Sequence, residues 1–312
     1  MLYRSLGRTG LEISELALGA ARGTEDRAQF IPTLHAIIHA GINFVDTAEG
    51  YGDSEEALGE ALVGHDDVIV ETKHCPYESY AVGAKFVGTG EKLTAAAEQS
   101  LRRLRRDRLD ILLGHGLRTV ESLDRFMNDG CYDAMVKLRE QGKVRFLGIS
   151  ELSEGDGTHE VLKKAVPSGA FDVVMLTINF LLQTAIDAVV PLCREHGVGT
   201  VVMMPLNQAS RESGLVSLPA ATECVRRHIA EGNLPAEPPY TEAELFDFLK
   251  PYSIPEAGLR FVLKQDVSAC CVGMRTVERL EENLKAVAPP YMDEARYARL
   301  IELFGRIQQQ VR

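Results

Sequence analysis

Short apolar runs recur along this chain, mostly about 30 residues apart. They are rich in Val, Ile and Leu and do not alternate with polar residues, a pattern typical of strands that are buried on both faces. The pattern predicts eight strands, at residues 16–20, 42–46, 68–72, 109–115, 144–150, 171–176, 199–204 and 268–273.

The stretches between these runs have helical periodicity, and several of them end in Gly just after the last turn, as helices commonly do. Eight helices are predicted, at residues 27–41, 54–64, 91–106, 132–142, 158–166, 183–197, 255–265 and 277–287.

Eight strands alternating with eight helices predict an α/β fold of the (β/α)8 TIM-barrel class. An open doubly wound sheet is the alternative, but it would more naturally contain five or six strands. The longest irregular stretches are 74–91 and 207–240, with an extension after residue 287. None resembles an interdomain linker, so we expect one domain over residues 1–312, with long loops at the C-terminal face of the barrel.

Composition narrows the class of protein. The chain has 45% hydrophobic and 25% charged residues, which is usual for a soluble globular domain. Its 34 Lys and Arg against 45 Asp and Glu give a net charge of −11, which argues against nucleic acid or an anionic membrane as the main partner. The N-terminus has no apolar leader segment, and no run of about 20 apolar residues occurs. We therefore expect a cytoplasmic protein.

Neither cysteines nor histidines have the spacing of a metal site. The six cysteines contain no CxxC pair, so reduced and mostly buried thiols are expected. His35 and His39 are four residues apart but lack the glutamate of the metalloprotease motif, and they lie on a predicted outer helix. No metal site is predicted.

Ionisable residues follow three neighbouring strands at the ends where barrel active sites lie. The second strand ends at Asp46, the third at Lys73 and the fourth at His115, while Tyr51 lies in the loop after the second. Taken singly, Asp46 could cap the next segment, Lys73 could extend to solvent and His115 could be a core histidine. Together, the four residues predict a site on one rim of the barrel.

The sequence resembles the aldo-keto reductases along nearly its whole length. The matching stretches are YRSLGRTGLEISELALG, GINFVDTAEGYGDSEEALGEAL, ETKH, SLRRLRRDRLDILLGH, GKVRFLGIS and GMRTVERLEEN. The DxxxxY spacing, followed by Lys and His at the next two strand ends, is highly specific for this family. The resemblance implies the same barrel and an NADP(H)-dependent oxidoreductase that interconverts a carbonyl compound and an alcohol. It makes Asp46, Tyr51, Lys73 and His115 the catalytic tetrad.

These four residues suit carbonyl reduction, which needs a general acid beside the carbonyl oxygen. An ammonium about 4 Å from the tyrosine would contribute about 4 kcal/mol at an effective dielectric constant near 20. We therefore expect Lys73 to lower the pKa of Tyr51 below its ordinary value near 10, by up to about 3. Asp46 would hold Lys73, and His115 would orient the carbonyl and help to move the proton.

Glu71 precedes Lys73 by two residues, so strict alternation along a strand places both on one face. Glu71 could pair with Lys73, or the end of the strand could depart from alternation. The sequence leaves both alternatives open.

A hydride donor is expected, but no GxGxxG loop follows a strand. The segment CVGMRTVERLEEN follows the last strand instead, and its Thr276 can cap a helix whose N-terminus suits a phosphate. Arg275, Arg279 and Asn283 recur at intervals of four, which also fits a solvated helix face. The resemblance implies that this segment holds the adenosine 2′-phosphate and adenine. Charge-assisted hydrogen bonds of about 1.5–3 kcal/mol would then favour NADPH/NADP+ over NAD(H) by about ten- to hundredfold.

The resemblance extends the predicted cofactor contacts to eleven residues: Ser150, Glu151, Met175, Met203, Pro205, Leu206, Gly273, Met274, Arg275, Arg279 and Asn283. Three of them depart from common family choices. Met175 stands where many relatives have glutamine, Met203 where an aromatic ring is common, and Glu151 where asparagine is common. Because a thioether packs well against an aromatic ring, nicotinamide binding is expected to survive the change at Met203.

Two other functions are compatible with parts of the sequence. One is a barrel that binds NADP(H) and senses redox state with little turnover, which the complete tetrad disfavours. The other is a barrel enzyme that forms a Schiff base on Lys73, which the nucleotide segment disfavours. The expected partner is a small-molecule carbonyl compound or alcohol. The sequence specifies neither that substrate, nor the preferred direction, nor the oligomeric state.

Overall fold

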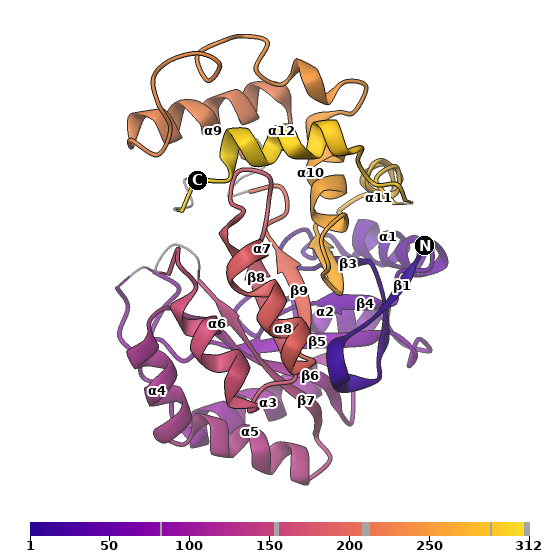
Figure 1. The fold of residues 1–312 in the computed structure, drawn as a ribbon. Helices are drawn as coiled ribbons and strands as arrows, with labels where there is room; N and C mark the ends of the chain where they lie inside the picture. Colours follow the sequence, from indigo (N-terminus) through magenta and orange to yellow (C-terminus); the bar gives the residue numbers. More distant parts are fainter. Residues whose placement is uncertain (82, 153–155, 208–212, 288, 309–312) are drawn as a thin grey trace.

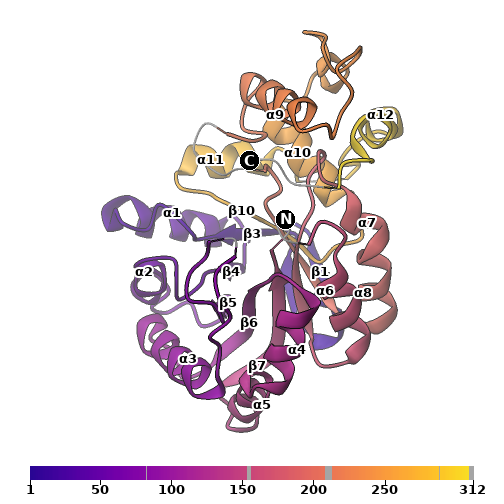
Figure 2. The ribbon, with the colours of Figure 1, turned by 90° about the vertical axis from the view of Figure 1, so that its left-hand side faces the viewer.

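The protein is a closed barrel of eight parallel strands surrounded by helices (Figure 1; Figure 2). The computed structural model describes residues 1–81, 83–152, 156–207, 213–287 and 289–308. The barrel strands, in chain order, are β3 (Leu16–Gly19), β4 (Phe44–Asp46), β5 (Ile69–His74), β6 (Leu109–Leu117), β7 (Val144–Glu151), β8 (Val173–Thr177), β9 (Gly199–Met203) and β10 (Ala269–Val272). Each overlaps one predicted run, and β10 closes the barrel against β3. The predicted (β/α)8 fold is confirmed.

Most of the helices connect these strands and cover the outside of the barrel. They are α1 (Arg27–His39), α2 (Ser54–Ala61), α3 (Gly90–Leu104), α4 (Val120–Asn128), α5 (Cys131–Glu140), α6 (Glu160–Ala165), α7 (Thr184–Ala188), α8 (Val190–His196), α9 (Leu218–Ala230), α10 (Ile254–Leu263), α11 (Val277–Leu284) and α12 (Glu294–Phe304). Short 3-10 helices are η1 (Gly7–Thr9), η2 (Val166–Ser168) and η3 (Asp247–Leu249).

Alternation along the strands divides the apolar residues into two cores. The larger core lies between the strands and the helices, and the smaller core fills the barrel. Fully buried members of the inner core include Phe44, Ile111, Leu113, Val173 and Val201. This packing makes the barrel a solid scaffold, so its functional groups lie at the rim rather than along a channel.

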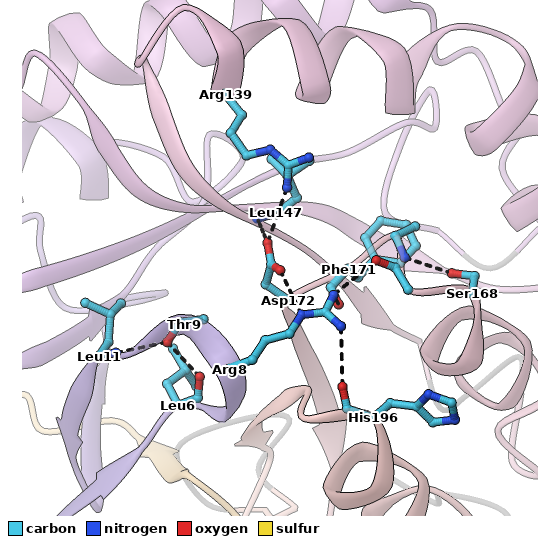
Figure 3. A network of polar contacts seen from close by, with 12 residues as sticks. Leu6, Arg8, Thr9, Leu11, Arg139, Leu147, Ser168, Phe171, Asp172 and His196 are labelled. Carbon is cyan, nitrogen blue, oxygen red and sulfur yellow. Dashed lines mark hydrogen bonds and ion pairs between the residues drawn. The ribbon is translucent and has the colours of Figure 1, made fainter.

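An N-terminal hairpin, which the sequence analysis did not predict, closes one end of the barrel. Strands β1 (Tyr3–Ser5) and β2 (Glu12–Ser14) pair antiparallel, and the residues Leu6, Leu11 and Ile13 join the inner core. Arg8 fastens the hairpin: its guanidinium donates hydrogen bonds to Asp172 Oδ1 (3.2 Å) and to the Phe171 carbonyl (2.9 Å) (Figure 3). Because Asp172 directly precedes the start of β8, the hairpin closes the N-terminal end and leaves the other rim for chemistry.

Four helical features differ from the expectations. The helix predicted over 183–197 is two helices, because Pro191 has no N–H and its ring clashes with the preceding turn. Helix α4 was not predicted. Helix α9 lies inside 207–240, which was expected to be irregular; Ser217 caps it and Pro219 occupies its first turn, two signals present in the sequence. The extension after 287 contains α12, while residues 208–212 and 288 lie outside the described residues.

The late elements form a layer at one end of the molecule, where α9 and α12 lie in both views (Figure 1; Figure 2). The ring of Phe304 from α12 packs against Phe180 and Phe246, with centroids 6.0 and 6.1 Å apart. Phe180 follows β8 directly, so this layer is anchored beside the carboxyl ends of the strands. Within the described residues, none of the helices is long and apolar enough to cross a bilayer.

Candidate active site at the carboxyl ends of the strands

A buried ion pair lies at the ends of β4 and β5. The Lys73 ammonium contacts Asp46 Oδ1 and also donates to the Thr47 carbonyl at 2.8 Å. Only 1% of the Lys73 side chain is exposed. Burial lowers the pKa of Lys73, but Asp46, through its charge and its hydrogen bond, helps to raise it above the ordinary value. The lysine therefore stays protonated at physiological pH.

Tyr51 lies beside this ammonium, with the Lys73 Nζ 5.0 Å from the centre of its ring. Desolvation of the phenol by the surrounding protein raises the pKa of Tyr51, and Lys73 only partly opposes it. The expectation of a lowered pKa is therefore wrong in sign. The ammonium lowers the pKa of Tyr51, but the loss of water around the phenol and the nearby Asp46 charge raise it by more. Tyr51 remains a protonated phenol at neutral pH.

His115 faces Tyr51 from β6, with ring centres 5.6 Å apart in an edge-on arrangement. The pairing of β6 with β7 shifts between Gly114 and Leu117, and Gly116 adopts a left-handed conformation at φ 67°. Such a bulge re-aims a side chain at the end of a strand. Burial and then Lys73 hold the pKa of His115 well below its usual value, so its imidazole is neutral.

A second phenol, which the sequence analysis missed, contacts this histidine. Tyr80 Oη lies 3.3 Å from His115 Nδ1, and the two ring centres are 5.0 Å apart. The Tyr80 ring covers Gly50: a Cβ there would lie 2.0 Å from the phenol oxygen. The only sequence signal was its place in the long segment 74–91. Gly50 is therefore required if Tyr80 is to lie beside His115.

The position of Glu71 resolves the question that the sequence left open. In the register of β4 and β5 it pairs with Asp46, and it is 0% exposed. The strand alternates cleanly: Ile69 lies in the inner core, whereas Thr72 points outward and donates to Glu55 at 2.6 Å. Yet among the described residues no donor reaches either oxygen of Glu71, and the polar group within hydrogen-bonding reach is the Asp46 carboxylate. Burial, and then the Asp46 charge, raise the pKa of Glu71 well above its usual value.

Ser150 and Glu151 end β7 and are fully engaged with the protein. Ser150 Oγ accepts a hydrogen bond from the Gly116 amide at 2.8 Å, which supports the bulge. Glu151 Oε1 accepts from the Thr177 amide at 2.9 Å, and its Oε2 lies 2.6 Å from His159 Nδ1. The pairing with His159 crosses from β7 to the start of α6, and the sequence analysis did not identify it. Both oxygens of Glu151 thus have protein partners.

The two methionines of the predicted cofactor site belong to neighbouring strands. Met175 on β8 lies in the inner core and is 2% exposed, while Met203 ends β9 and is partly buried against the same core. Beyond Met203 the chain turns through Met204 at φ 56°, a left-handed conformation that is unusual for a non-glycine residue. Asn179 donates to the Met204 carbonyl at 3.3 Å and holds this turn, after which Pro205 and Leu206 are buried.

The segment after β10 forms the capped helix that was expected. Thr276 Oγ1 accepts a hydrogen bond from the Arg279 amide at 3.3 Å. Of the three residues spaced by four, Arg275 is partly buried, Arg279 is exposed, and Asn283 is buried and donates to the Gly273 carbonyl (3.5 Å). Met274 is 1% exposed.

Arg275 and Arg279 have different surroundings. A Cβ on Gly23 would lie 2.9 Å from Arg275 Cγ, so this arginine packs across the loop between β3 and α1. Arg279 forms an ion pair with Glu282 at 2.5 Å, and its side chain is 57% exposed. The Arg279 guanidinium is therefore the more accessible of the two to a ligand.

A cavity of about 540 Å³ separates the start of α9 from α11. Its lining includes three cationic side chains, Lys250, Arg279 and Lys285, together with Ser217 and Asn283. The carboxylates of Asp247, Glu256 and Glu282 also line it. Lys250 is paired with Asp247 at 3.0 Å and Arg279 with Glu282 at 2.5 Å, so an anion that enters this cavity would exchange with these carboxylates.

Among the residues with described positions, no three His, Cys, Asp or Glu side chains cluster as metal ligands would. His35 Nε2 lies 2.9 Å from the Ala61 carbonyl, so that ring is committed to linking α1 with α2.

Comparison with known proteins relates the whole chain to one group of enzymes. The model of the Aldo/keto reductase family matches residues 15–303. L-galactose dehydrogenase of Arabidopsis thaliana is 31% identical over 298 residues, covering 91% of this chain and 87% of that protein. NADH-specific methylglyoxal reductase of Escherichia coli K12 is 27% identical over 320 residues, covering 90% and 92% respectively.

Among solved structures, the aldo-keto reductase AKR11C1 from Bacillus halodurans, in its holo form, superposes with a TM-score of 0.75. It is 24% identical to this chain, and the match covers 97% of this chain and 96% of that one. At this level of identity the likeness concerns the fold.

Proposed function

The chain belongs to the aldo/keto reductase family, and from that premise we propose that it is an NADP(H)-dependent oxidoreductase interconverting a small carbonyl compound and its alcohol. The proposal is carried by one observation: a buried ammonium, Lys73, lies 5.0 Å from the Tyr51 ring, and His115 faces the same phenol. We assign Tyr51 as general acid and base, Lys73 and Asp46 as its electrostatic support, and His115 as the group that orients the carbonyl.

The protonation states support these roles. The nicotinamide, when bound, supplies hydride to the carbonyl carbon. Tyr51 holds its proton at neutral pH and donates it from Oη as negative charge develops on the substrate oxygen, which is then far more basic than a phenolate. Lys73 stabilises the phenolate that remains, and Asp46 keeps the ammonium in place. His115 is neutral, so it has one N–H to donate to the substrate oxygen and one nitrogen to accept.

Cofactor preference forms a finer part of the proposal. Lys250, Arg279 and Lys285 line one cavity, and they favour NADPH over NADH if the 2′-phosphate replaces the carboxylates of Asp247 and Glu282 as their partner. Arg279 would exchange its partner Glu282 for the 2′-phosphate, and an exposed ion pair of this kind costs only about 0–1 kcal/mol to break. One relative is named as NADH-specific, which makes NADH the competing cofactor to test.

The eleven predicted cofactor contacts stay predictions: Ser150, Glu151, Met175, Met203, Pro205, Leu206, Gly273, Met274, Arg275, Arg279 and Asn283. The Glu151 carboxylate is bound by the Thr177 amide and by His159, so its main role is to hold the end of β7 in place.

A screen of NADPH oxidation over aldehydes, ketones, quinones and sugars tests the proposal. Tyr51→Phe should lower turnover by at least about 10²-fold, because the general acid is lost, while NADPH still binds. Binding is followed by the fluorescence of NADPH itself, since the chain has no tryptophan. Tyr3→Phe is the matched control, because this hydroxyl lies on the N-terminal hairpin and donates to the Gly41 carbonyl.

Three outcomes would redirect the assignment. Full activity in Tyr51→Phe would remove Tyr51 as the acid. Tight NADPH binding without oxidation by any carbonyl would favour a redox-sensing barrel. Borohydride trapping of a substrate on Lys73 would favour Schiff-base chemistry.

A further inference from the structure

Glu71 is a carboxyl group that the chemistry described above does not use, although it lies within the same cluster. It is fully buried, it pairs in register with Asp46, and it shares a strand face with Lys73. Among the described residues no donor reaches either oxygen, and the Asp46 carboxylate, which lies within hydrogen-bonding reach, can only accept. A buried polar group without partners is costly, so its presence needs a reason.

Charge balance decides the state of this carboxyl. The ionisable groups around Glu71 are Asp46 from β4, Lys73 from β5, Tyr51 from the following loop and Cys271 from β10. On β6, the register partner of Glu71 is the apolar Ile111. Tyr51 and Cys271 are neutral, because burial raises the pKa of each.

The cluster therefore holds one cation and two carboxyl groups. Lys73 is already bound to Asp46 and to the Thr47 carbonyl. An ionised Glu71 would leave a net negative charge in a site shielded from water, with no hydrogen-bond donor on it. A protonated Glu71 leaves the cluster neutral.

We propose that Glu71 is a positioning residue of the catalytic centre, a neutral acid beside the Lys73–Asp46 pair whose proton preserves the field of Lys73 on Tyr51. The role rests on the proposed function of Tyr51 as general acid. When Glu71 loses its proton to solvent at alkaline pH, its carboxylate opposes the ammonium, and the Tyr51 phenolate that forms during carbonyl reduction is less stabilised. Burial and Asp46 raise the pKa of Glu71, in agreement with a neutral acid at physiological pH.

The proton itself is tested on the enzyme alone, without cofactor or substrate. Infrared spectra of the wild type and of Glu71→Gln at pH 7 should differ by the C=O band of one protonated carboxyl, which the amide variant lacks. Glu55→Gln is the matched control: Glu55 is equally buried but is bound to Arg103 (3.3 Å) and Thr72 (2.6 Å), so its removal should take away no such band. An unchanged protonated-carboxyl region in Glu71→Gln would overturn the proposal.

The link to Tyr51 is tested by single-turnover NADPH oxidation from pH 6 to pH 10. Glu71→Gln keeps the shape of the neutral acid and cannot ionise, so its rate should lie within about twofold of the wild type at pH 6–7. As the carboxyl band of the wild type disappears with rising pH, the wild-type rate should fall at least about fivefold below that of the variant. A constant ratio of rates while the band disappears, or a band that persists at pH 10, would overturn the proposal.

Failure of the proposed function gives a different result. If neither protein oxidises NADPH with any carbonyl, the assigned activity is wrong, whereas the infrared band still reports on Glu71. In that case the wild type and Glu71→Gln are compared through the ionisation of Tyr51, measured as tyrosinate absorbance after rapid pH jumps, with Tyr51→Phe as the blank. Tyr51 should ionise about one pH unit lower in Glu71→Gln than in the wild type, because the opposing carboxylate is gone. Coincident titrations would refute the link.

Discussion

The neutral state of Glu71 also predicts how the stability of the fold depends on pH. In the unfolded chain this side chain has an ordinary pKa of about 4.3 and is ionised at neutral pH. In the folded protein, burial and then the Asp46 charge raise its pKa well above that value. Between the two values the folded state holds one proton more than the unfolded state. The contribution of Glu71 is therefore most favourable below pH 4.3 and is lost as the pH rises towards the folded-state value.

The size of the effect follows from linkage. While Glu71 stays protonated in the folded protein, each pH unit above 4.3 costs the wild type about 1.36 kcal/mol of unfolding free energy. The cost at pH 7 is then about 3.7 kcal/mol relative to a pH well below 4.3. Glu71→Gln removes the titration but keeps nearly the same volume. Its own packing penalty does not depend on pH and cancels when two pH values are compared.

Urea unfolding at pH 5.5 and pH 7.0 measures this difference. From pH 5.5 to pH 7.0, the unfolding free energy of Glu71→Gln should rise by about 2 kcal/mol relative to that of the wild type. Other titrating groups change both proteins equally, and Glu55→Gln should not gain in the same way, because Arg103 pairs with that carboxylate. Parallel pH curves for wild type and Glu71→Gln would show that Glu71 is ionised in the folded protein, and the reasoning would fail.

Three further predictions concern other parts of the molecule. Arg279→Ala should weaken NADPH binding about ten- to hundredfold and NADH binding less than about threefold in fluorescence titrations, because only NADPH carries the 2′-phosphate; equal losses would refute that contact. His159→Ala should cost about 3–5 kcal/mol in urea unfolding at pH 6, since it leaves Glu151 buried and unpaired. Burial lowers the pKa of His159, but Glu151 outweighs burial and raises it. The stabilisation by the His159–Glu151 pair is therefore complete below about pH 6.5 and decreases as the pH rises through the folded-state pKa. A stability difference between wild type and His159→Ala that widens at alkaline pH would contradict the pairing. Gly59→Ala should lower the unfolding free energy by about 1–3 kcal/mol, because its Cβ would lie 2.1 Å from the Arg103 carbonyl oxygen. Gly273→Ala, whose Cβ would meet nothing within 4 Å, should lower it by less than about 0.5 kcal/mol. Equal unfolding midpoints for the two variants would refute the steric argument.

Much of the fold could be predicted from the sequence because its signals are local. Apolar runs that do not alternate mark strands buried on both faces, and helical periodicity between them leaves few topologies besides a barrel. The break between α7 and α8 was also present locally, in Pro191, as was the start of α9, in Ser217 and Pro219. Both features are therefore predictable from local sequence signals.

The N-terminal hairpin is different, because its role depends on the tertiary structure. Its residues Leu6, Leu11 and Ile13 become core only when the end of the barrel is present to receive them. Arg8 binds Asp172, which lies 164 positions later in the sequence. No local sequence pattern predicts such a contact.

The candidate site divides in the same way. Three neighbouring strand ends placed Asp46, Lys73 and His115 on one rim, since the carboxyl ends of parallel strands meet there. The bulge that aims His115, the contact between Tyr80 and His115, and the pairing of Glu151 with His159 each join residues that are distant in sequence.

The sequence by itself determined the barrel, the residues at its rim and the alternation that puts Glu71 beside Lys73. Only the tertiary structure decided which protons those residues hold. The pKa of Tyr51 rises, rather than falls, because desolvation by residues from many elements outweighs one ammonium. Among the described residues no donor reaches Glu71, because Lys73 is already bound to Asp46. Alternation and spacing are properties of neighbours along the chain, whereas the electrostatic free energy of a buried charge depends on everything that replaces water around it.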